Sequence, residues 1–408
     1  MFELAALVAS GAYCYLAAGG VPSFWSAGVS VKIAMVTFIV LAVYEVVRLV
    51  FGDPLTKQRA FLKTLGSQEK KRQINVNEWI DGYNALHHNS DYVKEGDKAG
   101  VEERETKYQT LVNAYYELAT LFYEWGWGQC FHFATLGSRE RFIESIRRHE
   151  YYLAGKLGVT RGQKVLDCGC GIGGPGRNIA AYTGAQVTGI TLNEYQVQRG
   201  NELAKAQGLS ALYRSVQGDF MKLPFEDASF DGVFAIEATC HAPDRVKCYS
   251  EIFRVLKPGS VFACYEWCLT DKYDKNKPEH RDWKKKIEEG DGLPDIAHTS
   301  EIDQALKDSG FELVETEDVV DYTLQGDLPW YHPLTPSWNP FTQRFQFTPI
   351  GLAIMPQLLK VLEYIGAAPK GTCKVQSMLQ QAAIGLAKSG EVGAFTPMYL
   401  CVARKPTN

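Results

Sequence analysis

An excess of positive charge, metal-type cysteine spacing and repeated segments are all missing from this sequence. Lys and Arg number 43 against 47 Asp and Glu in 408 residues, so the net charge is −4, which argues against a nucleic-acid binder. The 10 Cys residues form no CxxC pair, which favours reduced thiols over a zinc site or a disulfide framework. No repeat or low-complexity tract occurs. Hydrophobic residues make up 46%, which excludes disordered and collagen-like chains and indicates a globular protein with a full core.

The longest uncharged run lies near the N-terminus. Residues 4–31 contain no charged side chain, and a second apolar run at 33–44 follows Lys32. The break at Gly19 to Pro22 leaves neither half with the roughly 20 apolar residues of a comfortable span. We expect residues 1–52 to associate with a membrane through a span or a shallow hairpin; the alternative is a buried helical pair. Basic residues just after the run place the remainder on the cytosolic side.

Residues 53–107 form a polar region that we interpret as a connector. It contains the His87–His88 pair, but no carboxylate or Cys stands at ligand spacing from it. An exposed loop is favoured there, and the sequence predicts no metal site.

The middle of the chain alternates short strands with helices. The pattern predicts strands at 164–167 and 186–191, a strand that ends at 219, and strands at 230–238 and 261–267. Helices are predicted at 177–183, 193–207 and 244–256, with a turn at 257–259. Two later strands are expected at 311–320 and 398–404. Repeated βαβ units predict an α/β fold with a mostly parallel sheet covered by helices on both faces. Ligands bind such sheets at the carboxyl ends of the strands.

A glycine-rich loop follows the first predicted strand. Its Gly169, Gly171 and Gly173 let the backbone bend and approach a ligand closely. Asp167 directly precedes the loop, where a carboxylate could meet a cationic amino group. Pro175 stands where dinucleotide-binding loops need a further Gly or Ala. A sulfonium cofactor with an amino-acid tail therefore fits better than a pyrophosphate.

Residues 165–173 (VLDCGCGIG) resemble motif I of class I methyltransferases that use S-adenosyl-L-methionine. Further blocks resemble sterol 24-C-methyltransferases: Tyr123 to Phe133 (YEWGWGQCFHF), Ile236 to Pro243 (IEATCHAP), Tyr265 to Asp271 (YEWCLTD) and Phe395 to Met398 (FTPM). The resemblance runs from about residue 105 onward. It implies a Rossmann-like, seven-stranded sheet whose last strand is inserted antiparallel. It also implies transfer of the cofactor's methyl group to C24 of a Δ24-sterol such as cycloartenol or 24-methylenelophenol.

The resemblance extends to location and assembly. The N-terminal apolar segment is similar to that of plant and algal members held at the endoplasmic reticulum membrane. We therefore expect a membrane partner, a catalytic part that faces the cytosol, and a homo-oligomer. Residues 108–270 are expected to hold the aromatic block and the cofactor-binding core. Residues 271–408 are expected to hold a lid, a sterol-pocket insertion and the last strands.

Other cofactor contacts are expected beyond the glycine loop. The second predicted strand ends without the acid that often binds ribose, so Thr191 or Gln196 is expected to replace it. Asp219 is placed to accept a hydrogen bond from the adenine amine, with Phe220 beside it; a helix N-cap is the alternative for Asp219.

The aromatic block suits the chemistry that the resemblance implies. Methylation of an isolated alkene leaves a carbocation on the sterol side chain, which ring faces and a carboxylate can stabilise. The residues expected to do so are Tyr123, Glu124, Trp125, Trp127, Phe131 and His132. The alternative is an aromatic-rich packing helix.

A base must then remove a proton after a 1,2-hydride shift. Glu237 and His241 are the leading candidates and His132 is a third; Glu237 could instead contact the cofactor. Tyr265, Glu266 and Trp267 are expected to line the same cavity. A lid is expected at 271–298, and an aromatic sterol-binding wall at 321–397. Two other functions stay open: methylation of another lipid, such as a cyclopropane-type lipid or a tocopherol-like phenol, and non-catalytic sterol carriage at a membrane.

Overall fold

The computed structural model describes seven helical positions between 109 and 124, and residues 127–407 apart from 325, 340, 341, 367 and 369. The predictions for residues 1–52 and 53–107, and for Trp125, lie outside the described residues. Within the described part of the chain, no helix has the length and apolar character needed to cross a bilayer.

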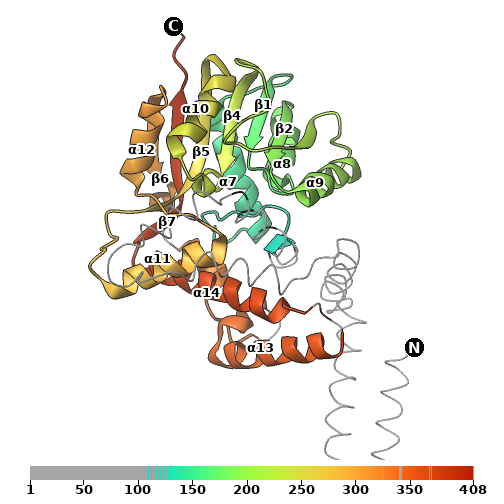
Figure 1. The fold of residues 1–408 in the computed structure, drawn as a ribbon, viewed down its shortest axis with the longest axis vertical. Helices are drawn as coiled ribbons and strands as arrows, with labels where there is room; N and C mark the ends of the chain where they lie inside the picture. The colour runs from blue at the N-terminus through green and yellow to red at the C-terminus, as the bar shows by residue number, and fades with distance from the viewer. Residues whose placement is uncertain are drawn as a thin grey trace, which may run out of the picture. The chain divides into compact units, whose positions relative to one another are not determined.

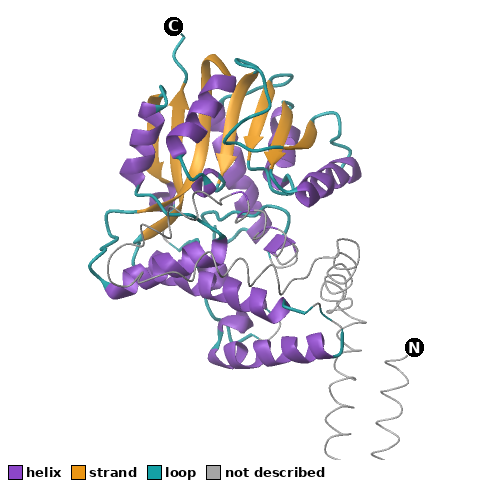
Figure 2. Ribbon diagram, viewed as in Figure 1, coloured by secondary structure: helices purple, strands orange, loops and turns teal. Residues whose placement is uncertain are grey.

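Seven strands form one sheet in the order β3-β2-β1-β4-β5-β7-β6 (Figures 1 and 2). Their bounds are β1 (Lys164–Cys168), β2 (Gln186–Thr191), β3 (Tyr213–Gln217), β4 (Phe230–Ile236), β5 (Leu256–Leu269), β6 (Glu312–Asp318) and β7 (Phe395–Arg404). The first five strands pair in parallel, whereas β7 pairs antiparallel with both β5 and β6. This arrangement confirms the predicted Rossmann-like sheet with an inserted antiparallel strand.

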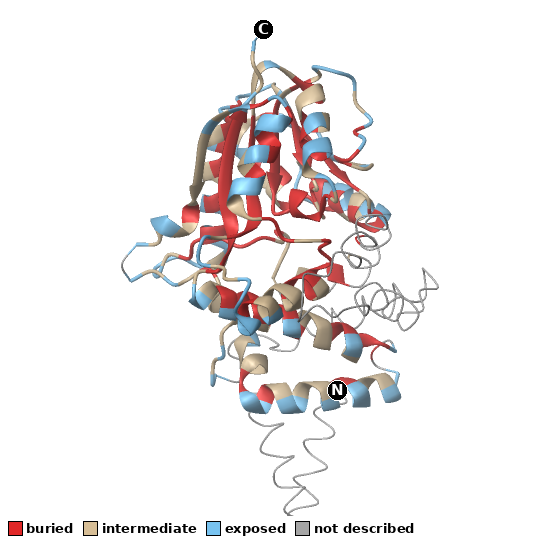
Figure 3. Cartoon of the chain, turned by 60° about the vertical axis from the view of Figure 1, so that its left-hand side comes forward, coloured by how far each residue is buried: buried red, intermediate tan, exposed pale blue. Residues whose placement is uncertain are grey.

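Helices cover both faces of the sheet because its strands are apolar on both sides (Figure 3). Val165 and Ala263 belong to one core cluster, with side chains of α7 (Phe142–Leu157), α8 (Gly174–Thr183) and α9 (Glu194–Ala206). Their chain neighbours Leu166 and Phe262 belong to the other, with α10 (Arg245–Val255) and α12 (Thr299–Asp308). Neighbouring strand residues thus fill opposite layers.

A helical layer lies beyond the sheet, at the end where β7 begins (Figure 1). It consists of α11 (Pro278–Asp291), α13 (Pro349–Tyr364), α14 (Thr372–Glu391) and short 3₁₀ turns. Small residues let α11 and α14 approach closely: the position that a Cβ on Gly385 would take is 2.9 Å from the Trp283 carbonyl oxygen. The predicted segment 271–298 therefore contains α11, and α13 and α14 belong to 321–397.

The predicted turn at residues 257–259 is wrong. These residues belong to β5, and the β4–β5 register shifts between Phe230 and Gly232. Gly259 takes a φ of +79° there and its N–H donates to the Lys405 carbonyl, so the chain continues through an irregular strand pairing. The strand ends predicted near 219 and 238 lie two residues too late, because β3 ends at Gln217 and β4 at Ile236.

Candidate active site

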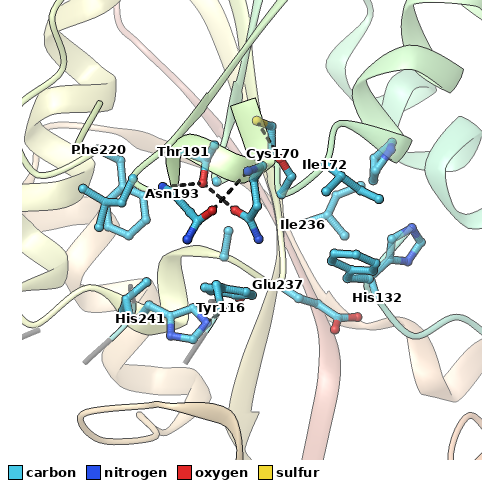
Figure 4. Close-up of a pocket in the computed structure, with 18 of the residues that line it drawn as sticks. Tyr116, His132, Cys170, Ile172, Thr191, Asn193, Phe220, Ile236, Glu237 and His241 are labelled. Atoms are coloured by element: carbon cyan, nitrogen blue, oxygen red, sulfur yellow. Dashed lines mark hydrogen bonds between the residues drawn. The ribbon is translucent and has the colours of Figure 1, made fainter. Parts of the chain in front are cut away.

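A cavity of about 720 Å³, including its open mouth, lies at the carboxyl ends of β1, β2 and β4 (Figure 4). The order of the sheet reverses between β1 and β4, the position where open α/β sheets bind ligands. The wall is formed by the glycine loop, the tip of β2, the residues after β4, the segment 129–132, and the helical residues Val112 and Tyr116.

The glycine loop forms one wall of this cavity. Gly169, Gly171 and Gly173 all have positive φ, at +79°, +53° and +73°, a conformation that side chains resist. The N–H groups of Gly169 and Cys170 donate to the Ile190 carbonyl at 3.0 Å, which ties the loop to β2. Gly173 is the N-cap of α8. The predicted loop geometry is therefore present.

Asp167 is a buried carboxyl at the end of β1. Its Oδ2 has no hydrogen-bond partner among the described residues, and burial raises its pKa to about 8. Gly176 of α8 keeps the space beside it, since a Cβ there would lie 2.7 Å from Oδ2. An unpaired buried carboxyl oxygen beside a glycine loop fits the cationic amino group of S-adenosylmethionine.

The tip of β2 carries neutral hydrogen-bonding groups. Thr191 Oγ1 donates to Gln196 Oε1 at 2.7 Å, and Gln196 Nε2 donates to Thr120 Oγ1 at 3.2 Å. Thr191 and Gln196 both line the cavity, as does Asn193, which sequence reasoning missed. Asn193 is the N-cap of α9, accepting from the Gln196 N–H, and its place between strand and helix is the signal that could have identified it.

Asp219 and Phe220 have different positions relative to the cavity. Asp219 Oδ1 accepts from the Met221 N–H at 2.8 Å, and its Oδ2 accepts from Gln109 at 2.6 Å. Phe220 lines the cavity, whereas Asp219 is not among the lining residues. Asp219 forms a turn rather than the alternative helix N-cap.

The aromatic block divides between the cavity and its surroundings. Phe131 and His132 line the cavity. Trp127 packs edge-on against Phe133 and Phe142, and its indole N–H donates to the His132 carbonyl at 2.8 Å. Trp127 thus holds the backbone that carries the two lining rings.

Tyr123 and Glu124 contact other elements of the fold. The Tyr123 hydroxyl donates to Asp291 at 3.1 Å, and its ring packs at 5.4 Å from that of Phe131. Glu124 forms an ion pair with Arg199 of α9. Neither residue is among those that line the cavity.

His132 belongs to a buried polar cluster. Its Nδ1 lies 2.7 Å from the Phe133 carbonyl oxygen, and its Nε2 lies 3.1 Å from Glu150 Oε1. Ligand atoms of Cys130, His132 and Glu150 lie within 4.8 Å of one another, a spacing that a metal ion could bridge. Asn178 Nδ2 donates to Glu150 Oε2 at 2.7 Å and to Cys130 Sγ at 3.6 Å, which links these side chains by hydrogen bonds. A hydrogen-bonded cluster describes these residues better.

Glu237 is a strained residue directly after β4. Its φ is +52°, which is rare for a residue with a side chain. Its carboxyl oxygens accept from the Phe133 N–H and from the Trp267 indole N–H, each at 2.7 Å. Burial raises its pKa to about 7. Glu237 lines the cavity and joins it to the aromatic block.

Tyr265, Glu266 and Trp267 lie behind the cavity wall, in contrast to the expectation that they line it. Tyr265 stacks on His149 at 3.8 Å, and Glu266 accepts from the Thr239 hydroxyl. Trp267 reaches the cavity only through its hydrogen bond to Glu237. All three are buried on β5, whose centre in the sheet is enclosed by both helical layers.

His241 and Tyr116 form a pair at the opposite wall (Figure 4). The Tyr116 hydroxyl lies 3.0 Å from His241 Nε2, and the Gly292 carbonyl oxygen lies 3.2 Å from Nδ1. Burial lowers the pKa of His241 to about 4, so the ring is neutral at neutral pH. Sequence reasoning missed Tyr116, although Tyr116, Thr120 and Tyr123 repeat at helical spacing.

The fold and its glycine-loop cavity define a class I methyltransferase. A family model for the methyltransferase domain matches residues 166–264, and one for the sterol methyltransferase C-terminal region matches residues 342–407. A cyclopropane synthase from Mycobacterium tuberculosis superposes with a TM-score of 0.56 at 16% identity, covering 73% of this chain and 98% of that one.

Curated relatives narrow the class to a family. Cycloartenol-C-24-methyltransferase 1 of Oryza sativa is 52% identical over 75% of this chain and 88% of its own length. Sterol 24-C-methyltransferase of Saccharomyces cerevisiae is 46% identical over 76% of this chain and 82% of its own length. The chain belongs to the sterol 24-C-methyltransferase family.

Proposed function

We propose that this protein transfers the methyl group of S-adenosylmethionine to C24 of a Δ24-sterol. The observation that carries the proposal is the shared wall of the cavity. The glycine loop, which fits the cofactor, and the ring of Phe131 face the same space, with Glu237 and His241 at its edge. The names of the relatives, cycloartenol-C-24-methyltransferase and sterol 24-C-methyltransferase, support the sterol as acceptor.

The bound cofactor supplies an electrophilic methyl group on a sulfonium. The residues of this chain position it: the Asp167 carboxyl fits its amino group, and Thr191 and Gln196 offer hydrogen bonds near the ribose. The acceptor alkene becomes a side-chain carbocation. The ring of Phe131 and the carboxyl of Glu237 are placed to stabilise it without forming a bond to carbon.

A product assay tests the proposal. Purified protein is given methyl-labelled cofactor with cycloartenol, with 24-methylenelophenol, or with a sterol that lacks the Δ24 bond, and the products are identified by mass spectrometry. We expect label in a 24-methylene sterol from the first acceptor and none with the saturated side chain. Label only in a phenol or in an unsaturated acyl lipid would favour the related methyltransferases. Binding of both ligands without transfer would favour a carrier.

We also propose that the protein works at the endoplasmic reticulum membrane with its catalytic part in the cytosol, as a homo-oligomer. The uncharged run at residues 4–31 supports membrane contact. A second support is an exposed apolar stripe along and just beyond α13: Ile350, Ile354, Leu358, Val361 and Ile365. Exposed Lys360, Lys370 and Lys374 stand near it, where they suit anionic lipid headgroups.

Vesicle flotation and light scattering test this part. Deleting residues 1–52 should reduce flotation with anionic vesicles, and Ile354→Asp with Leu358→Asp should reduce it further. The exposed Val314→Asp, on β6, is the matched control. Unchanged flotation of the deletion carrying both changes would contradict the membrane proposal, and a monomeric mass would contradict the oligomer.

A further inference from the structure

Proton loss from the sterol cation needs a group that can accept a proton and that faces the cavity. This step rests on the proposed function, since only an alkene acceptor produces such a cation. Five titratable side chains belong to the described residues that line the cavity: Tyr116, His132, Cys170, Glu237 and His241. The Cys170 thiol lies in the glycine loop, where it donates to the Gly171 carbonyl oxygen, which leaves the other four as candidates. Their hydrogen bonds show which of these side chains can accept a proton.

His132 has no ring nitrogen available. A carbonyl oxygen only accepts, so Nδ1 beside the Phe133 carbonyl must carry a proton. Nε2 faces the Glu150 carboxyl, so a proton lies between those two atoms as well. Burial is the largest single effect and opposes the charged ring, but the hydrogen bond to Glu150, the charges of Glu150 and Glu237 and the Phe133 carbonyl together raise the pKa of His132. The ring is therefore a donor on both sides.

Glu237 has both oxygens in use. One accepts from the Phe133 N–H and the other from the Trp267 indole N–H. Both donors stabilise the carboxylate form, because each hydrogen bond is stronger to a charged oxygen than to a protonated carboxyl. In its ionised form, Glu237 is better suited to stabilise the cation by its charge than to take its proton.

His241 has the opposite arrangement. Its Nδ1 faces the Gly292 carbonyl oxygen, so the proton of the neutral ring lies on Nδ1. The Nε2 lone pair is then left to accept the hydrogen bond from the Tyr116 hydroxyl. The Tyr116 oxygen thus holds a proton that it can pass on as it receives another.

We propose that Tyr116 is the catalytic residue that takes the proton from the sterol cation and that His241 acts through it as the second member of a relay. The C–H bond of the transferred methyl group breaks, and its electron pair forms the exocyclic C=C bond. The proton goes to the Tyr116 oxygen as the Tyr116 hydroxyl proton moves to His241 Nε2. The resulting imidazolium keeps its Nδ1–H bond to the Gly292 carbonyl and releases its proton to water after the product leaves.

The surroundings of the pair suit a transient charge. Burial raises the pKa of Tyr116, and Cys240, Asp291 and Glu237 raise it further by their charges, which keeps the phenol protonated at rest. Arg245 acts on His241 in the opposite direction to the Gly292 carbonyl and, with burial, keeps the ring neutral before the reaction. The relay therefore starts from two neutral side chains.

Product partitioning tests the relay. Tyr116→Phe keeps the ring packed on His241 but removes the hydroxyl. We expect cations to be diverted several-fold toward water-trapped alcohols and other alkene isomers, while cofactor affinity measured by calorimetry stays within about twofold. A trideuteromethyl cofactor should increase this diversion, because the lost proton comes from the transferred methyl group. His241→Asn should give the same shift, and the double variant should be no worse than either single variant.

Glu237→Gln is the contrasting variant. A product shift in Glu237→Gln with none in Tyr116→Phe would overturn the relay and make Glu237 the base. A histidine-labelled nitrogen-15 spectrum gives a readout independent of turnover: His241 should show the neutral Nδ1–H form, and Tyr116→Phe should move its Nε2 resonance. A charged His241 ring at neutral pH would also overturn the proposal. If the unchanged protein methylates no sterol, the proposed function fails before the relay is tested.

Discussion

Single residues beside the glycine loop, outside the set that lines the cavity, combine burial with missing partners. Asp167 shows this best, since its pKa near 8 means that the carboxyl is mostly protonated at pH 7 before a cation arrives. Binding of a cationic amino group favours the carboxylate, so binding at pH 7 should release up to one proton. Calorimetric titrations in two buffers of different ionisation enthalpy measure that release.

The matching variant is Asp167→Asn. It should lose the proton release and weaken cofactor binding by about 10- to 100-fold, from roughly 1.5–3 kcal/mol of charge-assisted hydrogen bonding. Asp227→Asn, at an exposed ion pair with Arg254, is the control and should bind as the parent does. Unchanged affinity in Asp167→Asn would remove this carboxyl from the cofactor site.

Glu124 requires a different test, because its ion pair with Arg199 competes with a direct role at the cation. If Glu124 acts by fixing its helical segment to α9, Glu124→Gln and Arg199→Gln should lower turnover equally. The double variant should then turn over no more slowly than either single variant. If its charge acts on the cation, only Glu124→Gln should weaken binding of a cationic azasteroid. Binding constants for the azasteroid and turnover rates of both variants separate the two.

Some residues of the site could be predicted from the sequence, and others could not. The positions of Asp167 and the three loop glycines could be predicted because their spacing follows from a loop that must bend at fixed points; their contacts with the cofactor stay predictions. Tyr116 and Glu150 could not, because each acquires its role from a partner more than 15 positions away: His241 for the first and His132 for the second. Tyr265 illustrates the reverse error, since a strand end near the site does not determine which way a side chain points.

At the scale of elements, two helical glycines make a matched pair. Gly155 of α7 is exposed and has open space around the position of a Cβ, whereas a Cβ on Gly176 of α8 would collide with Tyr213 and Asp167. Gly155→Ala should therefore stabilise the protein by about 0.5–1 kcal/mol. Gly176→Ala should destabilise it and weaken cofactor binding, because α8 must move away from β1.

Denaturant unfolding and calorimetry measure both effects. Equal effects of the two substitutions would contradict the packing between α8 and β3. The elements themselves were largely predictable: short, largely apolar strand segments and capped helices give their positions from local sequence, as at β2 and α9. The ends of the elements were less predictable, because the length of β5 depends on its pairing with β7, which lies more than 100 residues later in the chain.

At the scale of the whole molecule, buried carboxyls make stability depend on pH. Burial raises the pKa values of Asp167 and Glu266 to about 8, whereas unfolded carboxyls titrate near about 4. Between pH 7 and 8 the folded state therefore holds protons that the unfolded state has lost. The free energy of unfolding should fall as pH rises, by up to about 1.4 kcal/mol per pH unit for each group.

Urea unfolding of cofactor-free protein at pH 7.0, 7.5 and 8.0 measures this slope. Above pH 7 the neutral buried His241 no longer contributes, since an unfolded histidine has also lost its proton. Asp167→Asn should reduce the slope, and the exposed Glu226→Gln should not. A stability that rises across this range would show that these carboxyls are ionised in the folded protein.

The position of β7 has a consequence for synthesis. Residues 395–404 form the strand between β5 and β6, so β6 has no neighbour in the sheet until they have been made. A nascent chain on the ribosome can pair β1 to β5 as they emerge, but β6 and the open edge of β5 must wait for β7. Until then that edge, which runs along an apolar strand, is a template for pairing with other chains. Chaperones that protect exposed strand edges should therefore remain bound to this protein until translation has passed residue 404.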